Sequence, residues 1–190
     1  MKRVITWILA GMVIFLSGCS TIVGSINEDP IKIDPAERTW GSWLDDQTLE
    51  TVATVNIQKA DPLLKQARIK VVSFNGTLLI IGQVPSPELK NLAGETVKNL
   101  DHVKQVYNEL TVSPAADLLV QSNDSWLTTK IKTSLISEKR VSADRIKINT
   151  EKGTVYLMGI VSPKEAQAAV SVVRNTHGVQ KIVKVFEYTP

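Results

Sequence analysis

The sequence predicts an α+β protein made of two tandem copies of a small α-β-β-α-β unit, each with helices packed on one face of a three-stranded sheet. Two observations support this fold class. One is an internal repeat with a period near 77 residues, and the other is the same succession of helical and strand-like patterns in both copies. Each copy has about 65 residues, enough for one small core.

The repeat consists of five matched segments in the same order along the chain, which makes coincidence a poor explanation. The matched segments are Arg68–Val71 with Arg145–Ile148, Asn75–Thr77 with Lys152–Thr154, Gly82 with Gly159, Ser86-Pro87 with Ser162-Pro163, and Lys98-Asn99 with Arg174-Asn175. We therefore place one domain at 45–112 and a second at 124–190, joined by a linker at 113–123.

Each copy is expected to begin with a helix, because apolar residues recur at i, i+4 and i+8. These residues are Leu49, Ala53 and Ile57 in the first copy and Leu127, Ile131 and Leu135 in the second. Asp45, Asp46 and Asp124 directly precede the two helices. We expect them to cap free backbone N–H groups at the helix starts.

Two strands, a second helix and a closing strand follow in each copy. The strands are expected at 68–74, 77–83 and 105–112, then at 145–149, 154–160 and 181–188. Asn75-Gly76 suits the positive φ angles of a type I′ hairpin, and a Lys-Gly pair replaces it in the second copy. Pro87 and Pro163 stand where helix starts prefer proline.

The N-terminal segment follows the plan of a secretory signal peptide. Lys2 and Arg3 precede an apolar stretch over 4–15, which is shorter than the ~20 residues of a membrane-spanning helix. The following Leu-Ser-Gly-Cys sequence resembles the lipobox of bacterial lipoproteins, in which the cysteine is acylated and becomes the first residue. We expect residues 1–18 to be removed and Cys19 to carry the lipid.

An acylated Cys19 would hold the protein at a membrane permanently, because lipoproteins of this class carry three acyl chains and two already suffice for stable anchoring. Ser20 follows in place of aspartate, which favours the outer membrane under the sorting rule of enteric bacteria. Residues 19–44 are expected to form a tether. Within it, Trp40 and Trp43 are expected to pack on the first domain in preference to contacting lipid. Cys19 is the only cysteine, so the fold contains no disulfide.

Charge is distributed unevenly along the chain. The whole sequence carries a net charge of +3, with 22 basic and 19 acidic residues, and loss of Lys2 and Arg3 reduces this to +1. Residues 124–190 contain 11 basic and 6 acidic side chains, a balance of +5, whereas the rest of the mature chain is −4. The second domain is therefore the better candidate for an anionic partner.

Catalysis fits the sequence poorly, and we expect no enzyme, no cofactor and no metal site. His102 and His177 occupy equivalent positions before the last strands, where interaction with a helix C-terminus explains them. No cysteine remains for nucleophilic chemistry, and neither a His-x-x-x-His nor a Gly-x-Ser-x-Gly motif occurs.

The first helix of the second copy, expected at 125–137, has the most informative surface. Trp126 and Lys130 follow one another at i and i+4 on a stripe beside the core face, and Thr133 and Ser134 continue it. An indole suits the headgroup level of a membrane, and a lysine one turn away can meet a phosphate. Alternatively, Trp126 covers the neighbouring domain and Lys130 is merely solvated. The residues alone leave both possibilities open.

The repeated unit, with its central glycine and Ser-Pro helix start, resembles the BON domain, a small module of bacterial envelope proteins. Two such units behind a lipobox resemble the dual-BON lipoproteins of the DolP (YraP) type. The most specific match is Ser-Asn-Asp-x-Trp-x-Thr-Thr-Lys at 122–130, and Asp45-Asp46, Val106–Glu109 and Val155–Gly159 also match. Residues 20–33 depart from the family, since they are charged and contain proline where an Ala/Gly/Val-rich stretch is expected.

The resemblance implies a role in envelope integrity, with enrichment at division sites. It also implies that the second domain associates with anionic phospholipid such as phosphatidylglycerol through its first helix. The candidate contact residues are Trp126, Leu127, Lys130, Thr133 and Ser134. Two alternatives stay open, an adaptor that binds outer-membrane assembly or division proteins and a binder of peptidoglycan or another glycan. Nucleic acid is not expected as a partner in this compartment.

Overall fold

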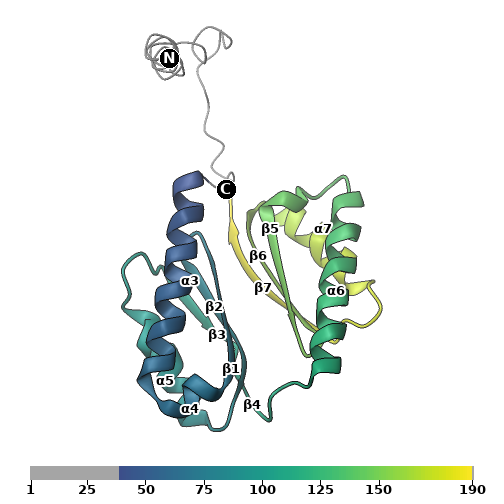
Figure 1. The fold of residues 1–190 in the computed structure, drawn as a ribbon. Coiled ribbons are helices and arrows are strands. Elements are labelled where there is room, and N and C mark those ends of the chain that lie inside the picture. Colours follow the sequence, from purple (N-terminus) through teal and green to yellow (C-terminus); the bar gives the residue numbers. More distant parts are fainter. Residues whose placement is uncertain (1–38, 190) are drawn as a thin grey trace, which may run out of the picture. The chain divides into compact units, whose positions relative to one another are not determined.

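The computed structural model describes residues 39–189, so the expected signal peptide, Cys19 and most of the expected tether lie outside the described residues. The predicted fold class is confirmed: the chain contains two α+β domains (Figure 1). In the first domain, the helices are α3 (Trp40–Ala60), α4 (Pro62–Gln66) and α5 (Pro87–Lys98). The strands are β1 (Arg68–Phe74), β2 (Thr77–Val84), β3 (Gln105–Asn108) and β4 (Thr111–Val112).

The second domain repeats this order with small differences. Helix α6 (Leu118–Ser137) is followed by a 3-10 turn η1 (Ala143–Arg145), and α7 (Pro163–Arg174) is the second helix. The strands are β5 (Ile146–Glu151), β6 (Thr154–Val161) and β7 (Lys181–Tyr188). In both domains an antiparallel hairpin pairs with a parallel closing strand. The closing strand of the first domain is broken into β3 and β4, whereas β7 is continuous.

The two first helices begin earlier than expected. Helix α3 starts at Trp40, inside the expected tether, and its N-cap is Thr39, whose hydroxyl accepts a hydrogen bond from the Ser42 amide at 3.1 Å. Helix α6 starts at Leu118, inside the expected linker, and is capped by Asp117. The caps are 78 residues apart, so the repeat extends further upstream than the sequence pattern indicated.

The expected capping role of Asp45, Asp46 and Asp124 is wrong, because Asp45 is already the sixth residue of α3. Asp46 and Asp124 are each the seventh residue of their helix, and both are buried. Each carboxylate instead accepts hydrogen bonds from the turn of the hairpin beside it. Asp46 binds the amides of Asn75 and Gly76 at 2.8 and 3.0 Å, and Asp124 binds those of Lys152 and Gly153 at 2.7 and 2.9 Å. The expected type I′ geometry is confirmed by positive φ at both central residues of each turn.

The repeated glycines of β2 and β6 are required by a close approach within the hairpin. A Cβ on Gly82 would overlap the carbonyl oxygen of Arg68, and a Cβ on Gly159 would overlap that of Arg145. Any larger residue would push the paired strand away.

Apolar side chains project from both faces of each sheet. The helices of the same domain cover only one of these faces. In the first domain Leu78 and Ile80 pack under the helices, and in the second domain Val155 and Leu157 do the same. The alternate residues form a third cluster that joins the two domains. Its buried members are Val72, Phe74, Leu79, Ile81, Tyr156, Met158, Ile160 and Val185. Burial in this cluster raises the pKa of Tyr156 to about 12, and the carboxylates of Glu109 and Glu151 add to the shift.

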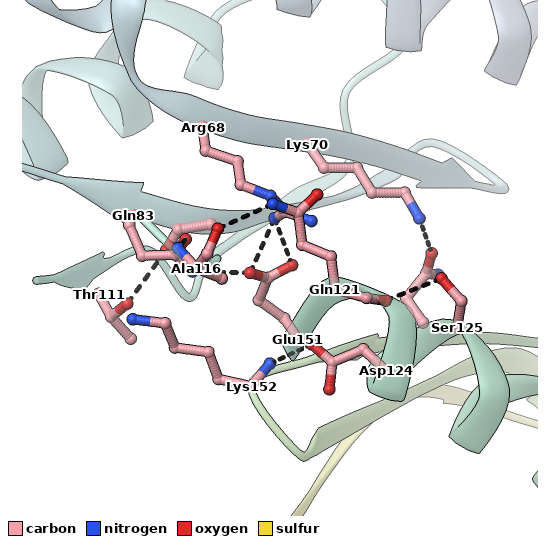
Figure 2. A network of polar contacts seen from close by, with 12 residues as sticks. Arg68, Lys70, Gln83, Thr111, Ala116, Gln121, Asp124, Ser125, Glu151 and Lys152 are labelled. Carbon is pink, nitrogen blue, oxygen red and sulfur yellow. Dashed lines mark hydrogen bonds and ion pairs between the residues drawn. The ribbon is translucent and has the colours of Figure 1, made fainter. Parts of the chain in front are cut away.

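Polar contacts also cross between the domains, and Figure 2 shows one network of them. Arg68 on β1 donates to both carboxylate oxygens of Glu151 on β5, at 2.8 and 2.7 Å, and the side-chain amide of Gln83 donates to the same group at 2.7 Å. Glu151 is only 6% exposed, so these donors replace the hydrogen bonds to water that its buried carboxylate lacks. A second pair of contacts joins Lys70 to Asn149 and Lys147 to Glu50, each at 2.7 Å.

The hairpin caps can be tested by comparing two adjacent carboxylates. Asp46→Ala should lower the free energy of unfolding by about 2 to 3 kcal/mol, because buried turn amides lose their acceptor. The same change at the exposed neighbour Asp45, for which no hydrogen bond is observed, should have little effect. Urea unfolding followed by circular dichroism measures both variants. Equal losses would contradict the assignment of Asp46 as the cap.

The polar contacts between the domains can be tested at Glu151. Glu151→Ala should cost about 3 kcal/mol, because it leaves the buried parts of Arg68 and Gln83 without their acceptor. Glu95→Ala is the control, since Glu95 forms an exposed ion pair with Lys98 at 3.5 Å and should change stability little. A Glu151 variant as stable as the Glu95 variant would show that the buried pair contributes nothing.

Candidate functional site

Helix α6 presents two unlike faces. Asp124, Leu127, Ile131 and Leu135 are buried, and the three apolar residues belong to the core of the second domain. Trp126 projects from the opposite side with 59% of its surface exposed. The alternative in which Trp126 covers the neighbouring domain is disfavoured, because more than half of its side chain is exposed.

Trp126 and Lys130 lie against each other on this exposed face. The Lys130 ammonium nitrogen is 5.0 Å from the centroid of the Trp126 ring, within the range of a cation–π interaction. The contact holds the charge beside the flat side of the indole. An anion that reaches Lys130 therefore meets an aromatic surface as well.

The hydroxyls of the stripe are less available than the sequence indicated. Thr133 donates to the carbonyl of Thr129 at 3.0 Å, and Ser134 donates to the carbonyl of Lys130 at 3.0 Å. Ser134 is also half-buried. Because these hydroxyl protons are used within the helix, Lys130 and the indole N–H of Trp126 are the donors of this stripe with which an anion can form hydrogen bonds.

Leu127 must be removed from the candidate contact residues. It is 4% exposed and packs with the core under the sheet, so it offers almost no surface to a membrane. The structure adds exposed apolar residues, two of which the expected helix start at 125 concealed. Leu119 lies two turns before Trp126 and about 20° from it around the helix axis. Leu118, Leu119 and Ile136 are 82%, 78% and 67% exposed.

A pocket of about 340 Å³ lies beside Trp126, between α6 and the β5–β6 turn. Two of its charged lining groups are already engaged. Asp124 accepts from the turn amides, and the Lys152 ammonium donates to the Ser113 hydroxyl at 3.1 Å and the Pro114 carbonyl at 2.9 Å. The exposed stripe is therefore better equipped for an anion than the pocket is.

The first domain lacks an equivalent stripe. When the two repeats are aligned on their hairpin caps, Asp46 and Asp124, Thr48 takes the position equivalent to Trp126. Val52 takes the position equivalent to Lys130. The aromatic and basic pair belongs to α6 alone.

Neither the two histidines nor any acidic cluster in the described residues forms a catalytic or metal site. His102 lies four residues beyond the end of α5 and His177 three residues beyond α7, so neither occupies the last helical turn in which a helix-dipole effect was expected. Within residues 39–189, no cluster of three or more His, Cys, Asp or Glu side chains could hold a metal ion. In the same part of the chain, no helix has the length and apolar character needed to span a membrane.

Comparison with known proteins gives two matches to one family model, the BON domain, at residues 45–114 and 123–190. The outer membrane lipoprotein DolP of Haemophilus influenzae is 39% identical over 181 residues, which cover 95% of this chain and 94% of that protein. A protein named 21 kDa hemolysin from Actinobacillus pleuropneumoniae is 38% identical over 156 residues, covering 82% of this chain and 79% of its own.

Substitutions on the two faces of α6 should differ in their effect on the free energy of unfolding. Leu127→Ala should lower the free energy of unfolding by about 2 to 4 kcal/mol, because it opens a cavity in the core. Trp126→Ala should have a much smaller effect, since most of the indole is already in contact with water. Urea unfolding of the two variants checks this. A large loss from Trp126→Ala would mean that the indole serves the fold.

Proposed function

This chain belongs to the BON-domain family, as a dual-BON lipoprotein of the DolP type, and from that premise we propose that it acts at the outer membrane, where its second domain binds anionic phospholipid through α6. The observation that carries the proposal is the exposed Trp126 stacked on Lys130, on a helix whose opposite face is fully used by the core.

The surface combines the two contributions that a peripheral contact with anionic lipid needs. The indole and the exposed leucines Leu118 and Leu119 provide apolar area at the level of the headgroups. Lys130 provides a charge worth about 1 kcal/mol near an anionic leaflet. The second domain as a whole carries a charge of +5, which adds longer-range attraction.

Two signals of different strength would then determine where the protein resides. Acyl chains on Cys19 would fix the chain to the periplasmic face of the outer membrane, and the weaker contact through α6 would select regions rich in anionic lipid. In this proposal the protein is not an enzyme, and it supports envelope integrity by its position, with enrichment where such lipid accumulates during division.

Cosedimentation with vesicles tests the lipid contact. The chain from Ser20 to Pro190, which has no acyl anchor, should bind phosphatidylglycerol vesicles and not phosphatidylcholine vesicles. Trp126→Ala should weaken binding by roughly tenfold or more through loss of buried indole area, and Lys130→Ala by about fivefold. Binding should fall steeply as salt rises, because the attraction is electrostatic.

Lys132→Ala is the matched control, since Lys132 is exposed on the same helix but lies about 120° from Trp126 around the axis. It removes the same charge and should leave most of the binding intact. Equal binding to both lipids, or equal losses for Lys130 and Lys132, would refute a specific contact through this stripe. Salt-resistant capture of a protein partner through Trp126, with no binding to vesicles, would favour the adaptor instead.

A further inference from the structure

The first turn of α3 carries an apolar cluster that the fold leaves uncovered. Trp40 is 86% exposed, Trp43 is 45% exposed and Leu44 is 60% exposed. The two indoles contact each other edge to face, with ring centroids 6.1 Å apart. The expectation that both pack on the first domain is not met by Trp40, which is almost fully exposed, whereas Trp43 is about half-buried.

Isolated exposed apolar side chains need no explanation. Two tryptophans whose rings contact each other, together with a leucine, form a patch of the kind that marks a contact surface. The core stripe of α3 begins at Asp46 and Leu49, so the first turn extends beyond the part of the helix that the domain buries. The described fold therefore leaves a large part of the apolar surface of this turn exposed.

The position of the first turn of α3 in the sequence favours a membrane as its contact partner. The residues between Cys19 and Trp40 number 20, and a segment of that length reaches at most roughly 70 Å when fully extended. Along the chain, the first turn of α3 is thus the part of the described fold nearest to the proposed anchor. Once Cys19 is held in a bilayer, contact of this turn with that bilayer is intramolecular, so even a weak attraction suffices.

We propose that the first turn of α3 is a second membrane contact, in which Trp40, Trp43 and Leu44 enter the lipid–water interface of the membrane that holds Cys19. Tryptophan is enriched at that level because its ring is apolar and its N–H remains hydrogen-bonded. The proposal rests on the anchor at Cys19 proposed above, but not on lipid binding by α6.

The chemistry of this contact differs from that of α6. Residues 40–45 contain no basic side chain and one acid, Asp45. Their attraction to a bilayer therefore depends on burial of indole and leucine surface and needs no anionic lipid. In the anchored chain it should persist on neutral phosphatidylcholine and in high salt, where the α6 contact is expected to fail. Without the anchor it is too weak to hold the chain on vesicles.

Fluorescence of the chain from Cys19 to Pro190 can separate the two contacts. This chain contains three tryptophans, at 40, 43 and 126, and one cysteine. The Cys19 thiol can therefore be coupled to a maleimide lipid in preformed vesicles, which imposes the anchor whether or not acylation occurs in the cell. Trp126→Phe leaves only the α3 pair, and the double variant Trp40→Phe/Trp43→Phe leaves only Trp126.

In phosphatidylcholine vesicles brominated near the glycerol end of the acyl chains, the coupled Trp126→Phe chain should lose fluorescence and shift its emission to shorter wavelength. The double variant should show neither change there, and it should be quenched only when phosphatidylglycerol is added. Loss of quenching of the Trp126→Phe chain after Leu44→Asp would support apolar entry of the turn.

The proposal is overturned if the coupled Trp126→Phe chain keeps its full fluorescence. It is also overturned if Trp40 and Trp43 are already shielded from aqueous acrylamide before coupling, since another part of the chain would then cover them. Absence of quenching of the double variant in phosphatidylglycerol would sink lipid binding by α6 and leave the α3 contact standing.

Discussion

Each domain of this protein contains a sheet that is apolar on both faces, and the rest of the structure follows from that constraint. Two helices can cover only one face of a three-stranded sheet. The face that remains, with Leu79 and Ile81 in one domain and Tyr156 and Met158 in the other, is buried because the two domains share a cluster. The repeat therefore functions as a structural pair, since each copy supplies the cover that the other lacks.

The two copies are not interchangeable within this pair. Phe74 and Glu151 occupy equivalent positions at the ends of β1 and β5, yet one joins the shared apolar cluster and the other accepts from Arg68 and Gln83. A pair of two identical copies would bury either two carboxylates or none. Pairing of the first domain with the second is therefore more favourable than pairing of two copies of the same domain. Only in the mixed pair do Arg68 and Gln83 offset the cost of burying the Glu151 carboxylate.

Because the sheets are used for mutual cover, the surfaces left for other partners are on helices. The outer face of α6 carries an aromatic ring beside a cation, and the first turn of α3 carries aromatic rings with no cation. The equivalent positions of the other copy carry different residues. Thr48 is equivalent to Trp126, and Leu118 is equivalent to Trp40. At these two helical surfaces the copies differ at exposed positions, where the difference does not disturb the cores.

The sequence by itself determined the features that depend on local chemistry and periodicity. The hairpin turns at Asn75-Gly76 and Lys152-Gly153, the helix starts at Pro87 and Pro163, and the inward stripe of Leu127, Ile131 and Leu135 all follow from short-range rules. The exposed position of Trp126 beside Lys130 also follows from helical spacing. A continuous apolar run such as Leu78–Ile81 was a readable signal of burial on both faces, because a strand with one solvated face alternates.

Only the tertiary structure decided what the buried aspartates and the upstream residues do. A carboxylate near a helix start can accept from the helix or from any other free amide, and the hairpin that brings amides to Asp46 and Asp124 is about 30 residues away along the chain. The helix starts at Trp40 and Leu118 were equally hidden, because their first turns lack an apolar stripe that faces a core. For the same reason Trp40 and Trp43 are exposed: burial depends on which surfaces meet in three dimensions, and residue type alone does not specify that.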